Sequence, residues 1–315
     1  MQKKKVINVD HGNRNVKTNN HAFPASFMES GHLPSMDADT LVFKGKEYVL
    51  VDRRMPQKTD KTVDEDYFIL TLLAIGKEIM SDTDIHSGTQ SGELVDVVLL
   101  VGLPPLHCKE FSTKFSRYFK RDKTISFSYN GLHIAINIVD VHVFPQAYSA
   151  AITILERIKD MHTVNIVDIG GYTVDLLQLT NMRPNMSLCT SLYFGANMLF
   201  QKINEQVRAK GANNIPDAVI EGILMEDKKV LHDSTHERIT LVLSCAEAFV
   251  RDMLLEVSQT GIELTENRTV FVGGGSILLK VYIEKTGMVA KPLFVDNVHA
   301  NAEGYLLLYQ NRNPV

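Results

Sequence analysis

The sequence predicts an α/β fold that is built twice, with mixed sheets carrying helices on both faces. Three observations predict it: a short pattern recurs at half the length of the chain, apolar runs of strand length alternate with segments of helical period, and glycine-rich turns follow the strands. The chain has 315 residues. This length suits two domains of about 150 residues, each able to bury its own core.

The recurring pattern is a strand–turn–strand unit with an aspartate at the head of its turn. It occupies residues 10–17 (DHGNRNVK) and again residues 168–175 (DIGGYTVD), 158 positions later. An apolar strand leads into each copy, at residues 6–9 and 164–167, and alternating residues lead out of each. One such echo arises easily by chance, but matching contexts at half-chain spacing do not. We therefore interpret the repeat as a duplication.

Three further segments complete the first half. Residues 96–102 form a continuous apolar run that ends in a glycine followed by Leu-Pro-Pro, as expected of a strand buried on both faces. Residues 125–144 are rich in strand formers, and Asn130 with Gly131 is a strong hairpin turn signal. Residues 146–161 have the period of a helix, with their apolar side chains on one face.

The second half is predicted to be largely helical between its strands. A long helix begins near Ser234, where Ser234 and Glu237 match a capping box, and it ends at Gly261, which suits a left-handed stop. The other elements expected here are a helix at about 195–210, a short helix after Pro216, a strand at 269–272, a helix through Leu278 and Tyr282, and a closing helix at about 302–310.

The segment from about residue 20 to residue 90 fits the repeat poorly and contains a hairpin-like stretch at 41–51. We interpret this segment as an insertion subdomain in the first half. The first domain then comprises residues 1–158 together with a C-terminal helix at 300–315. The second domain comprises residues 159–299.

Composition and charge exclude several classes of protein. The formal charge is -4 and the pI about 6.3, so the basic surface of a protein that grips nucleic acid directly is not expected. The three cysteines are scattered and form no CxxC pair, which is typical of a reduced intracellular chain. No signal peptide and no run of about 18 apolar residues is found. We expect a cytoplasmic protein without membrane contact.

The two turns of the repeat have the composition of a phosphate site. Glycine and small polar residues let backbone N–H groups approach a ligand closely, and concave arrays of such groups bind anions. Two such turns in homologous halves are expected to hold the phosphate chain of a nucleotide from both sides, in a cleft between the domains. The expected contacts are Gly12, Asn13 and Asn15 in the first turn and Gly170, Gly171, Tyr172 and Thr173 in the second.

Asp10 and Asp168 head the two turns. A carboxylate beside phosphate is repulsive unless a cation intervenes, and Mg²⁺ suits this role because it keeps several waters and needs only one or two carboxylates. We therefore assign Asp10 and Asp168 to Mg²⁺ through water and count both as catalytic. The alternative is that each aspartate merely caps a tight turn.

Three more features are candidate parts of the site. Lys17, on the strand that leaves the first turn, is placed to reach a β- or γ-phosphate, or is a solvated strand lysine. The run Gly273-Gly274-Gly275 suits a nucleoside lying flat against the main chain, although a plain strand-to-helix turn needs only one glycine. Gln146, at a helix start, is a candidate for orienting an attacking water, or is a solvated first-turn residue.

Five segments in order along the chain resemble the motif set of the actin, sugar kinase and heat-shock chaperone ATPase superfamily, namely phosphate 1, connect 1, phosphate 2, adenosine and connect 2. The likeness implies a duplicated ribonuclease-H-like fold, the actin-like ATPase fold, with two domains around a nucleotide cleft. The matching segments are Asp10-x-Gly12, Phe144-Pro145-Gln146, Asp168-x-Gly170-Gly171, Gly273-Gly274-Gly275 and Ala300-Asn301-Ala302-Glu303-Gly304.

Within this superfamily the chain looks most like the ParM-type plasmid-segregation actins, in its length and in the run Val101-Gly102-Leu103-Pro104. The resemblance implies ATP or GTP with Mg²⁺, slow hydrolysis, head-to-tail filaments of the chain itself, and an adaptor protein bound to centromere-like DNA. ParM-like proteins often carry an acidic residue where this chain has Gln146, which puts the hydrolysis rate in question. The alternatives are a small-molecule kinase of the same superfamily and a cytoskeletal or phage actin with another cargo.

Overall fold

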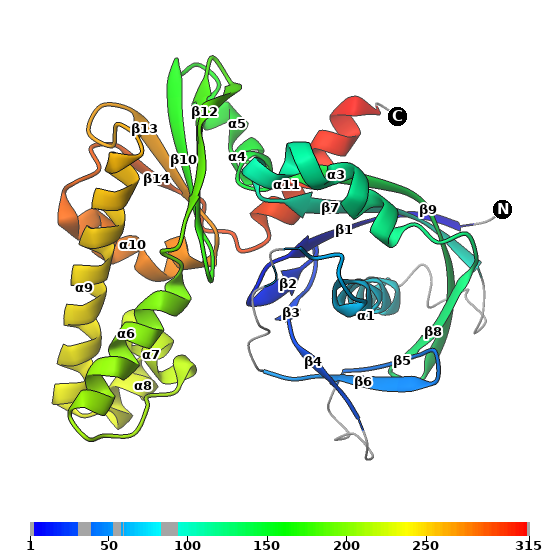
Figure 1. Cartoon of the computed structure of the whole chain (residues 1–315), viewed down its shortest axis with the longest axis horizontal. Coiled ribbons are helices and arrows are strands. Elements are labelled where there is room, and N and C mark those ends of the chain that lie inside the picture. The colour runs from blue at the N-terminus through cyan, green and yellow to red at the C-terminus, as the bar shows by residue number, and fades with distance from the viewer. Residues whose placement is uncertain (1–2, 31–38, 53–57, 59, 83–93, 314–315) are drawn as a thin grey trace. The chain divides into compact units, whose positions relative to one another are not determined.

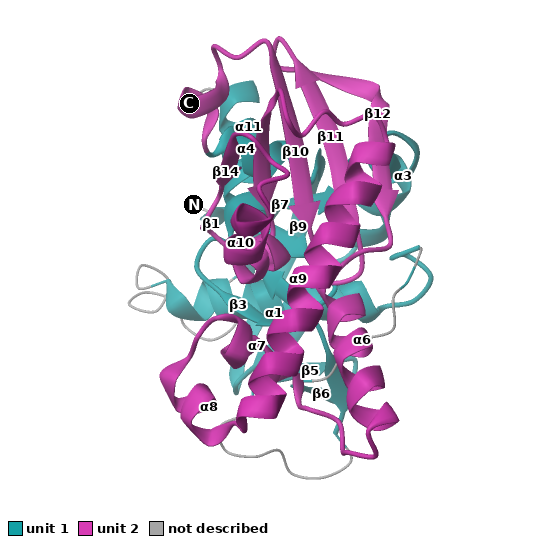
Figure 2. Cartoon of the chain, turned by 90° about the vertical axis from the view of Figure 1, so that its left-hand side faces the viewer, with its two compact units in different colours: residues 1–153, 299–315 teal, residues 154–298 magenta. Residues whose placement is uncertain are grey.

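The computed structural model of the chain describes residues 3–30, 39–52, 58, 60–82 and 94–313. The chain forms two compact units. The first contains residues 1–153 and 299–315, and the second contains residues 154–298 (Figure 2). The chain therefore leaves the first unit once and returns to it at its C-terminal end.

The first unit holds a sheet that has nine strands within the described residues, in the order β3-β2-β1-β7-β9-β8-β5-β6-β4. Its strands are β1 (Lys3–His11), β2 (Asn15–Lys17), β3 (Ala22–Pro24), β4 (Phe27–Glu29), β5 (Thr40–Phe43), β6 (Lys46–Leu50), β7 (Leu94–Leu103), β8 (Ile125–Tyr129) and β9 (Leu132–Pro145). Its helices are α1 (Asp66–Ser81), α3 (Pro105–Phe119), α4 (Tyr148–Ile152) and α11 (Ala300–Arg312).

The second unit holds a five-stranded sheet with the order β12-β11-β10-β13-β14. Its strands are β10 (Thr163–Ile169), β11 (Val174–Thr180), β12 (Arg183–Leu192), β13 (Arg268–Val272) and β14 (Pro292–Phe294). Its helices are α5 (Leu155–Ile158), α6 (Ala196–Ala209), α7 (Asp217–Leu224), α8 (Lys228–Asp233), α9 (His236–Gln259) and α10 (Gly274–Thr286).

The two sheets share one topology. In β3-β2-β1-β7-β9 and in β12-β11-β10-β13-β14, the first three strands pair antiparallel and the last three pair parallel. The hairpin register also repeats, because Asp10 pairs with Lys17 and Asp168 pairs with Asp175. This agreement confirms the predicted duplicated α/β fold. β3 corresponds to β12 of the second sheet, whereas β4 corresponds to no strand there. β3 therefore belongs to the repeated sheet rather than to the inserted segment.

The inserted segment helps to enclose α1. Figure 1 shows the strands of the first unit curling around this helix, and eleven of its sixteen residues are buried. The predicted hairpin at 41–51 is present as β5 and β6, which pair antiparallel. Much of the rest of the expected insertion, at residues 31–38, 53–57, 59 and 83–90, lies outside the described residues.

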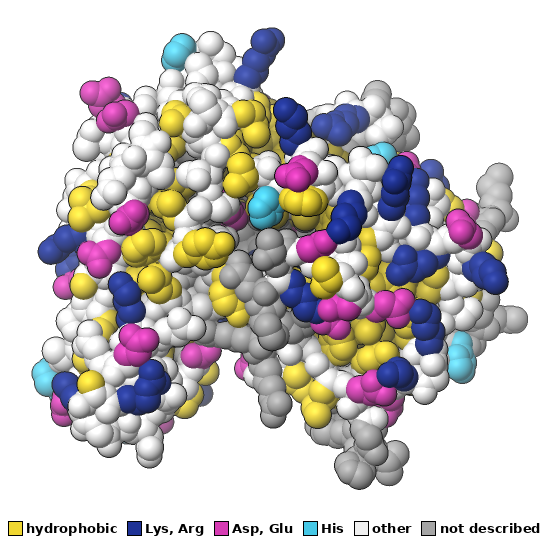
Figure 3. Space-filling model, in the orientation of Figure 1, with side chains coloured by type: hydrophobic (Ala, Val, Ile, Leu, Met, Phe, Trp, Pro, Cys, Tyr) yellow, Lys and Arg dark blue, Asp and Glu magenta, His cyan; other side chains and the backbone are white. Residues whose placement is uncertain are grey.

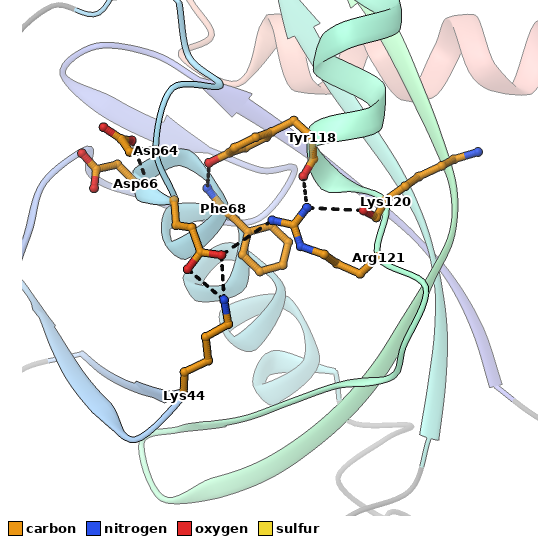
Figure 4. Close-up of polar contacts among 8 residues, drawn as sticks. Lys44, Asp64, Asp66, Phe68, Tyr118, Lys120 and Arg121 are labelled. Carbon is orange, nitrogen blue, oxygen red and sulfur yellow. Dashed lines mark hydrogen bonds and ion pairs between the residues drawn. The ribbon is translucent and has the colours of Figure 1, made fainter.

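A cluster of side chains fixes the start of α1 (Figure 4). The side chain of the N-cap residue, Glu65, makes no capping hydrogen bond, although Asp64 Oδ1 accepts from the Asp66 N–H at 3.1 Å. From another helix, the Tyr118 hydroxyl accepts a hydrogen bond from the Phe68 N–H at 2.8 Å, and the Arg121 guanidinium lies 4.1 Å from the Phe68 ring centroid. Lys44, in the β5–β6 turn, pairs with Glu65 at 2.7 Å. The cluster thus joins the inserted hairpin to α1 and to the end of α3.

Two helix predictions need correction. The helix expected at 146–161 is two short helices, α4 and α5, because the backbone leaves helical geometry at Ile154 (φ -117°, ψ 23°). The Thr153 hydroxyl donates to Ala150 O at 2.6 Å at this break. The predicted capping box at Ser234 is also wrong. The cap of α9 is Thr235, whose hydroxyl accepts from the Arg238 N–H at 3.3 Å, while Ser234 closes α8.

Charged side chains are mixed in sign over the surface. Figure 3 shows Lys and Arg interspersed with Asp and Glu on the visible side of each unit, as expected from the slightly acidic sequence. Within the described residues, none of the helices combines the length and the apolar character needed to cross a membrane.

Candidate functional site

The first turn presents a buried carboxylate with two unlike oxygens. Asp10, at the end of β1, is only 2% exposed. Its Oδ1 accepts hydrogen bonds from Gln146 Nε2 at 2.6 Å and from the Tyr305 hydroxyl at 3.3 Å. Its Oδ2 lies 3.8 Å from Lys17 Nζ. One oxygen therefore faces neutral donors and the other faces a cation.

Sheet topology explains why these groups meet. β1, β7 and β9 are parallel neighbours, so their carboxyl ends lie at one edge of the sheet, where open α/β sheets bind ligands. Asp10 lies near the carboxyl end of β1, and Gln146 directly follows β9, so both are at that edge. Lys17 reaches the same place because it pairs with Asp10 across the β1–β2 hairpin.

Gln146 is held in one orientation. Its backbone N–H donates to Leu103 O at 2.8 Å. The next residue, Ala147, has φ 59°, and its N–H donates to Asn301 Oδ1 at 2.9 Å. The amide nitrogen of Gln146 faces Asp10, because it is the donor to Asp10 Oδ1. Its carbonyl oxygen is then turned away from Asp10 and is oriented as an acceptor.

The first turn is tightly folded between its strands. A Cβ at Gly12 would lie 2.6 Å from Asn15 O and 3.6 Å from Lys17 Nζ, so a side chain here would displace the turn. Lys61 Nζ donates to His11 O at 2.7 Å and so ties the segment before α1 to the end of β1. Asn13 and Asn15, the other predicted contacts, are partly exposed in this turn and at the start of β2.

Asp168 occupies the equivalent position in the second turn. It is the last residue but one of β10 and is 8% exposed. Directly across the ladder lies Asp175, also 8% exposed, which accepts hydrogen bonds from the Ser191 and Thr173 hydroxyls. The second turn therefore carries a pair of carboxylates where the first carries a carboxylate and a lysine.

Helix α6 orients the main chain of the second turn. Its first N–H groups, from Gly195, Ala196 and Asn197, donate to three carbonyls of the turn at 2.8 to 3.1 Å. Because each peptide unit is planar and trans, the N–H of the following residue points the opposite way. The carbonyls in question belong to Gly170, Gly171 and Tyr172, so the N–H groups of Gly171, Tyr172 and Thr173 point away from α6.

The three consecutive glycines have different roles. Gly273 has φ 86°, and a Cβ there would lie 2.3 Å from Asp168 Oδ1; a Cβ at Gly275 would lie 2.7 Å from Ile169 O. Both are therefore required by packing of the β13–α10 turn against β10. Gly274 is exposed, and a Cβ at that position would have no atom within 4 Å. Packing therefore accounts for Gly273 and Gly275, and Gly274 is the position of the three that is open.

The acidic side chains of each turn suit a hard cation with few protein ligands. Among the described residues there is no cluster of three or more His, Cys, Asp or Glu side chains of the kind that holds a metal ion entirely by protein. Each turn instead offers one or two carboxylates. Mg²⁺ accepts this number because it retains several waters.

Sequence reasoning missed four contributors to these turns. They are Tyr305, Lys61, Asp175 and the N-terminus of α6. In the sequence, two glycines, Gly195 and Gly102, indicate that another group approaches the backbone closely at these positions. A Cβ at Gly195 would lie 2.4 Å from Gly171 O, and a Cβ at Gly102 would lie 1.9 Å from the Tyr305 hydroxyl.

Two family models match consecutive parts of the chain. The N-terminal domain of actin-like proteins matches residues 8–148, and the C-terminal domain of the archaeal actin homologue MreB-like matches residues 166–285. Together they span most of the chain and place one domain on each unit. A search of curated proteins found no significant match.

Several solved structures have the same fold. The archaeal actin homologue Ta0583 is 17% identical, with a TM-score of 0.77, over 97% of this chain and 99% of that one. Its complex with ADP gives 18% identity and a TM-score of 0.73, over 97% and 99%. A subunit of a 15-stranded ParM filament from Clostridium botulinum is 16% identical, with a TM-score of 0.72, over 99% and 100%. At these identities the likeness establishes the fold.

Proposed function

Because the chain is an actin-like protein, related in fold to ParM, we propose that it is a nucleotide-dependent filament former that hydrolyses ATP or GTP and segregates plasmid DNA. The observation that carries the proposal is the repeated turn. Each unit ends its first strand in a buried aspartate, at the same register of the same hairpin. We infer that each of these turns supplies ligands to the phosphates of a bound nucleotide.

The residues divide the work as follows. Lys17 supplies a positive charge to the phosphates, and the N–H groups of the second turn, which α6 directs outward, donate to phosphate oxygens. Asp10 and Asp168, with Asp175 beside it, hold Mg²⁺ through water; when bound, the ion neutralises phosphate charge. The nucleotide contacts we assign are Gly12, Asn13, Asn15, Lys17, Gly170, Gly171, Tyr172, Thr173 and the run Gly273 to Gly275, of which Gly274 alone is open.

Gln146 orients the attacking water. Its amide nitrogen is engaged with Asp10 at 2.6 Å, so its carbonyl oxygen is the atom presented to the water. A neutral amide is a weak base and positions water without strongly activating it. Slow turnover follows, which suits a filament whose lifetime is set by hydrolysis.

The partners follow from the kind of assembly. A filament needs different surfaces at its two ends, because it is an open head-to-tail polymer. The ParM similar in fold to this chain was solved as a filament, and Ta0583 was solved with ADP. The net charge of -4 argues for an adaptor protein between the filament and centromere-like DNA, rather than direct contact. We place this activity in the cytoplasm.

High-speed pelleting tests the proposal. The chain is incubated with Mg²⁺ and ATP, GTP, ADP or a non-hydrolysable triphosphate, and phosphate release is followed in parallel. We expect polymer with a triphosphate, loss of polymer as phosphate appears, and lasting polymer with the analogue. Turnover without polymer would favour a small-molecule kinase. If the chain shows no nucleotide binding and no turnover, the proposed nucleotide dependence is refuted.

A matched pair of variants ties the result to the second turn. Asp168→Asn should reduce phosphate release by at least about tenfold, because it removes a carboxylate assigned to Mg²⁺. Asp160→Asn removes an equal charge from an exposed position in the same unit and should leave the rate unchanged. Equal rates for the two variants would remove Asp168 from the mechanism.

A further inference from the structure

The C-terminal helix sends one side chain into the first turn. Tyr305, on α11, is completely buried, and its hydroxyl donates to Asp10 Oδ1 at 3.3 Å across 295 positions of sequence. The distance is longer than that of a typical O–H···O bond. In ligand-free catalytic sites such bonds are often long and tighten when the ligand is present.

Packing explains the ring of Tyr305 but not its hydroxyl. The ring stacks on Phe144 with centroids 5.8 Å apart and belongs to a small apolar cluster with Val98 and Leu100. A phenylalanine would fill that space equally well. A buried hydroxyl costs free energy unless it is hydrogen-bonded, and Asp10 is the partner that the fold supplies.

The fold also keeps a space for this hydroxyl. Gly102 lies on β7 beside it, and a Cβ at position 102 would come within 1.9 Å of the oxygen and 2.3 Å of Cζ. No other residue fits at position 102 while Tyr305 keeps its place. The glycine that ends the predicted buried strand is thereby explained by a side chain from the far end of the sequence.

Two donors now converge on a single carboxylate oxygen. Gln146 and Tyr305 both donate to Oδ1 of Asp10, and each is neutral. Rotation of the carboxylate would break both bonds. Oδ2 is therefore kept toward Lys17, 3.8 Å away, and is the oxygen left for a hydrated cation.

We propose that Tyr305 is a positioning residue: its hydroxyl fixes the Asp10 carboxylate so that Oδ2 is presented to the water shell of Mg²⁺. This inference rests on the nucleotide hydrolysis proposed above. It makes the C-terminal helix part of the hydrolytic site through one hydrogen bond. Nucleotide affinity in the absence of Mg²⁺ does not depend on that bond.

Tyr305→Phe tests the inference because it removes the hydroxyl alone. Tyr309→Phe is the matched control, since Tyr309 is on the same helix and packs on His142 at 5.0 Å. Single-turnover phosphate release, Mg²⁺ titration of that rate, and binding of a fluorescent ADP in EDTA are measured on the full chain. For Tyr305→Phe we expect a rate about 3 to 10 times lower and a half-saturating Mg²⁺ concentration raised by a similar factor.

Fluorescent ADP should bind Tyr305→Phe in EDTA as tightly as it binds the parent, and Tyr309→Phe should match the parent throughout. A role in packing alone would leave the Mg²⁺ dependence unchanged. If the parent hydrolyses nucleotide and Tyr305→Phe does so at the same rate and the same Mg²⁺ requirement, the inference is wrong and the proposed function stands. If the parent binds no nucleotide, both are wrong.

Discussion

His11 is a buried imidazole inside the turn that carries Asp10. The Thr71 hydroxyl donates to Tyr67 O at 2.7 Å, so it must accept from His11 Nε2, also at 2.7 Å. The proton is thus on Nε2, and Nδ1 has no partner among the described residues. Burial, and secondarily the charge of Lys61, hold the pKa of His11 well below its usual value of 6.5.

This depressed pKa predicts a pH dependence of stability. As pH falls below about 6.5, the unfolded chain binds a proton at position 11 that the folded chain excludes, so the free energy of unfolding falls by up to about 1.4 kcal/mol per pH unit. His11→Gln keeps a donor to Thr71 but does not titrate, and its stability should fall less steeply between about pH 6.5 and 5. Urea unfolding at several pH values measures both slopes.

The control for this prediction is His232→Gln, because the side chain of His232 is 88% exposed. The Asp60 carboxylate does not titrate in this pH range, because the Lys114 ammonium and Thr62 lower its pKa to about 2, so its contribution to stability is lost only in stronger acid. Parallel curves for His11→Gln and the parent would show that the imidazole is protonated in the folded chain.

The contact between Gln146 and Asp10 can be tested by placing a second carboxylate at position 146 and measuring stability against pH. In Gln146→Glu, a carboxylate replaces the amide that now contacts Asp10 at 2.6 Å. Two buried carboxylates in contact resist ionisation together, so the pKa of the new group is raised in the folded state. Its stability contribution is then present in acid and lost as pH rises. The free energy of unfolding of Gln146→Glu should fall below that of the parent by about 1 to 3 kcal/mol more at about pH 8 than at about pH 5.

Thermal unfolding at the two pH values, with and without Mg²⁺, checks this prediction. Mg²⁺ should reduce the deficit at the higher pH, because a cation between the carboxylates relieves their repulsion. Gln146→Met is the uncharged control and should show a deficit that does not change with pH. A pH-independent deficit in Gln146→Glu would mean that Asp10 and position 146 separate in solution.

At the scale of elements, close contact between α4 and α11 depends on a single glycine. A Cβ at Gly304 would lie 1.9 Å from Ser149 O, a backbone atom that cannot move aside as a side chain can. Gly304→Ala should therefore push the helices apart and cost about 1 to 3 kcal/mol, which lowers the melting temperature by about 2 to 10 °C. Differential scanning calorimetry measures the shift.

Gly274→Ala is the matched control for Gly304→Ala. It also lies in the first turns of a helix, but its added Cβ would have nothing within 4 Å. The substitution should leave the melting temperature unchanged or raise it slightly, because alanine favours a helix over glycine. A similar loss in both variants would indicate a general intolerance of alanine in these helices instead of a clash with Ser149.

The strands and the turns could be predicted because their signals are local, and the duplication because one such local signal recurs 158 positions later. Neighbouring residues determine where a strand or a turn forms, and the cross-strand partner of Asp10 follows from the length of the turn. The predicted N-cap of α9, Ser234, is one position before the observed one, Thr235, because Ser and Thr are both favoured at an N-cap. The cap of α1 was out of reach, because Tyr118 arrives from another helix 50 positions away.

The candidate site shows the same division. Asp10, Asp168 and Gln146 stand at predictable strand ends. The role of Gly102 depends on Tyr305. The direction of the N–H groups in the second turn depends on the hydrogen bonds that the start of α6 makes to its carbonyls. These roles require the tertiary fold, since no sequence pattern indicates which distant side chain will occupy the space beside a glycine.

At the scale of the whole molecule, the last segment of the chain completes the first unit. After the second unit the chain returns at residue 299. His299 Nδ1 contacts Thr18 O at 2.7 Å, and Asn8 Nδ2 donates to Ala302 O at 2.5 Å. Tyr305 and Ala302 are fully buried there. The first unit therefore lacks part of its core until the end of the chain is in place.

Deletion of residues 299–315 should destabilise the two units unequally. In hydrogen exchange, peptides from β1 and β7 should lose protection, because they lose the buried surface and hydrogen bonds supplied by α11. Peptides from β10 and β13 should exchange as in the parent, since the second unit has its own core. A synthetic peptide of residues 299–313 added to the truncated chain should restore protection in β1, and the same peptide carrying Gly304→Ala should not. Equal loss of protection in both sheets would show instead that the units fold as one cooperative body.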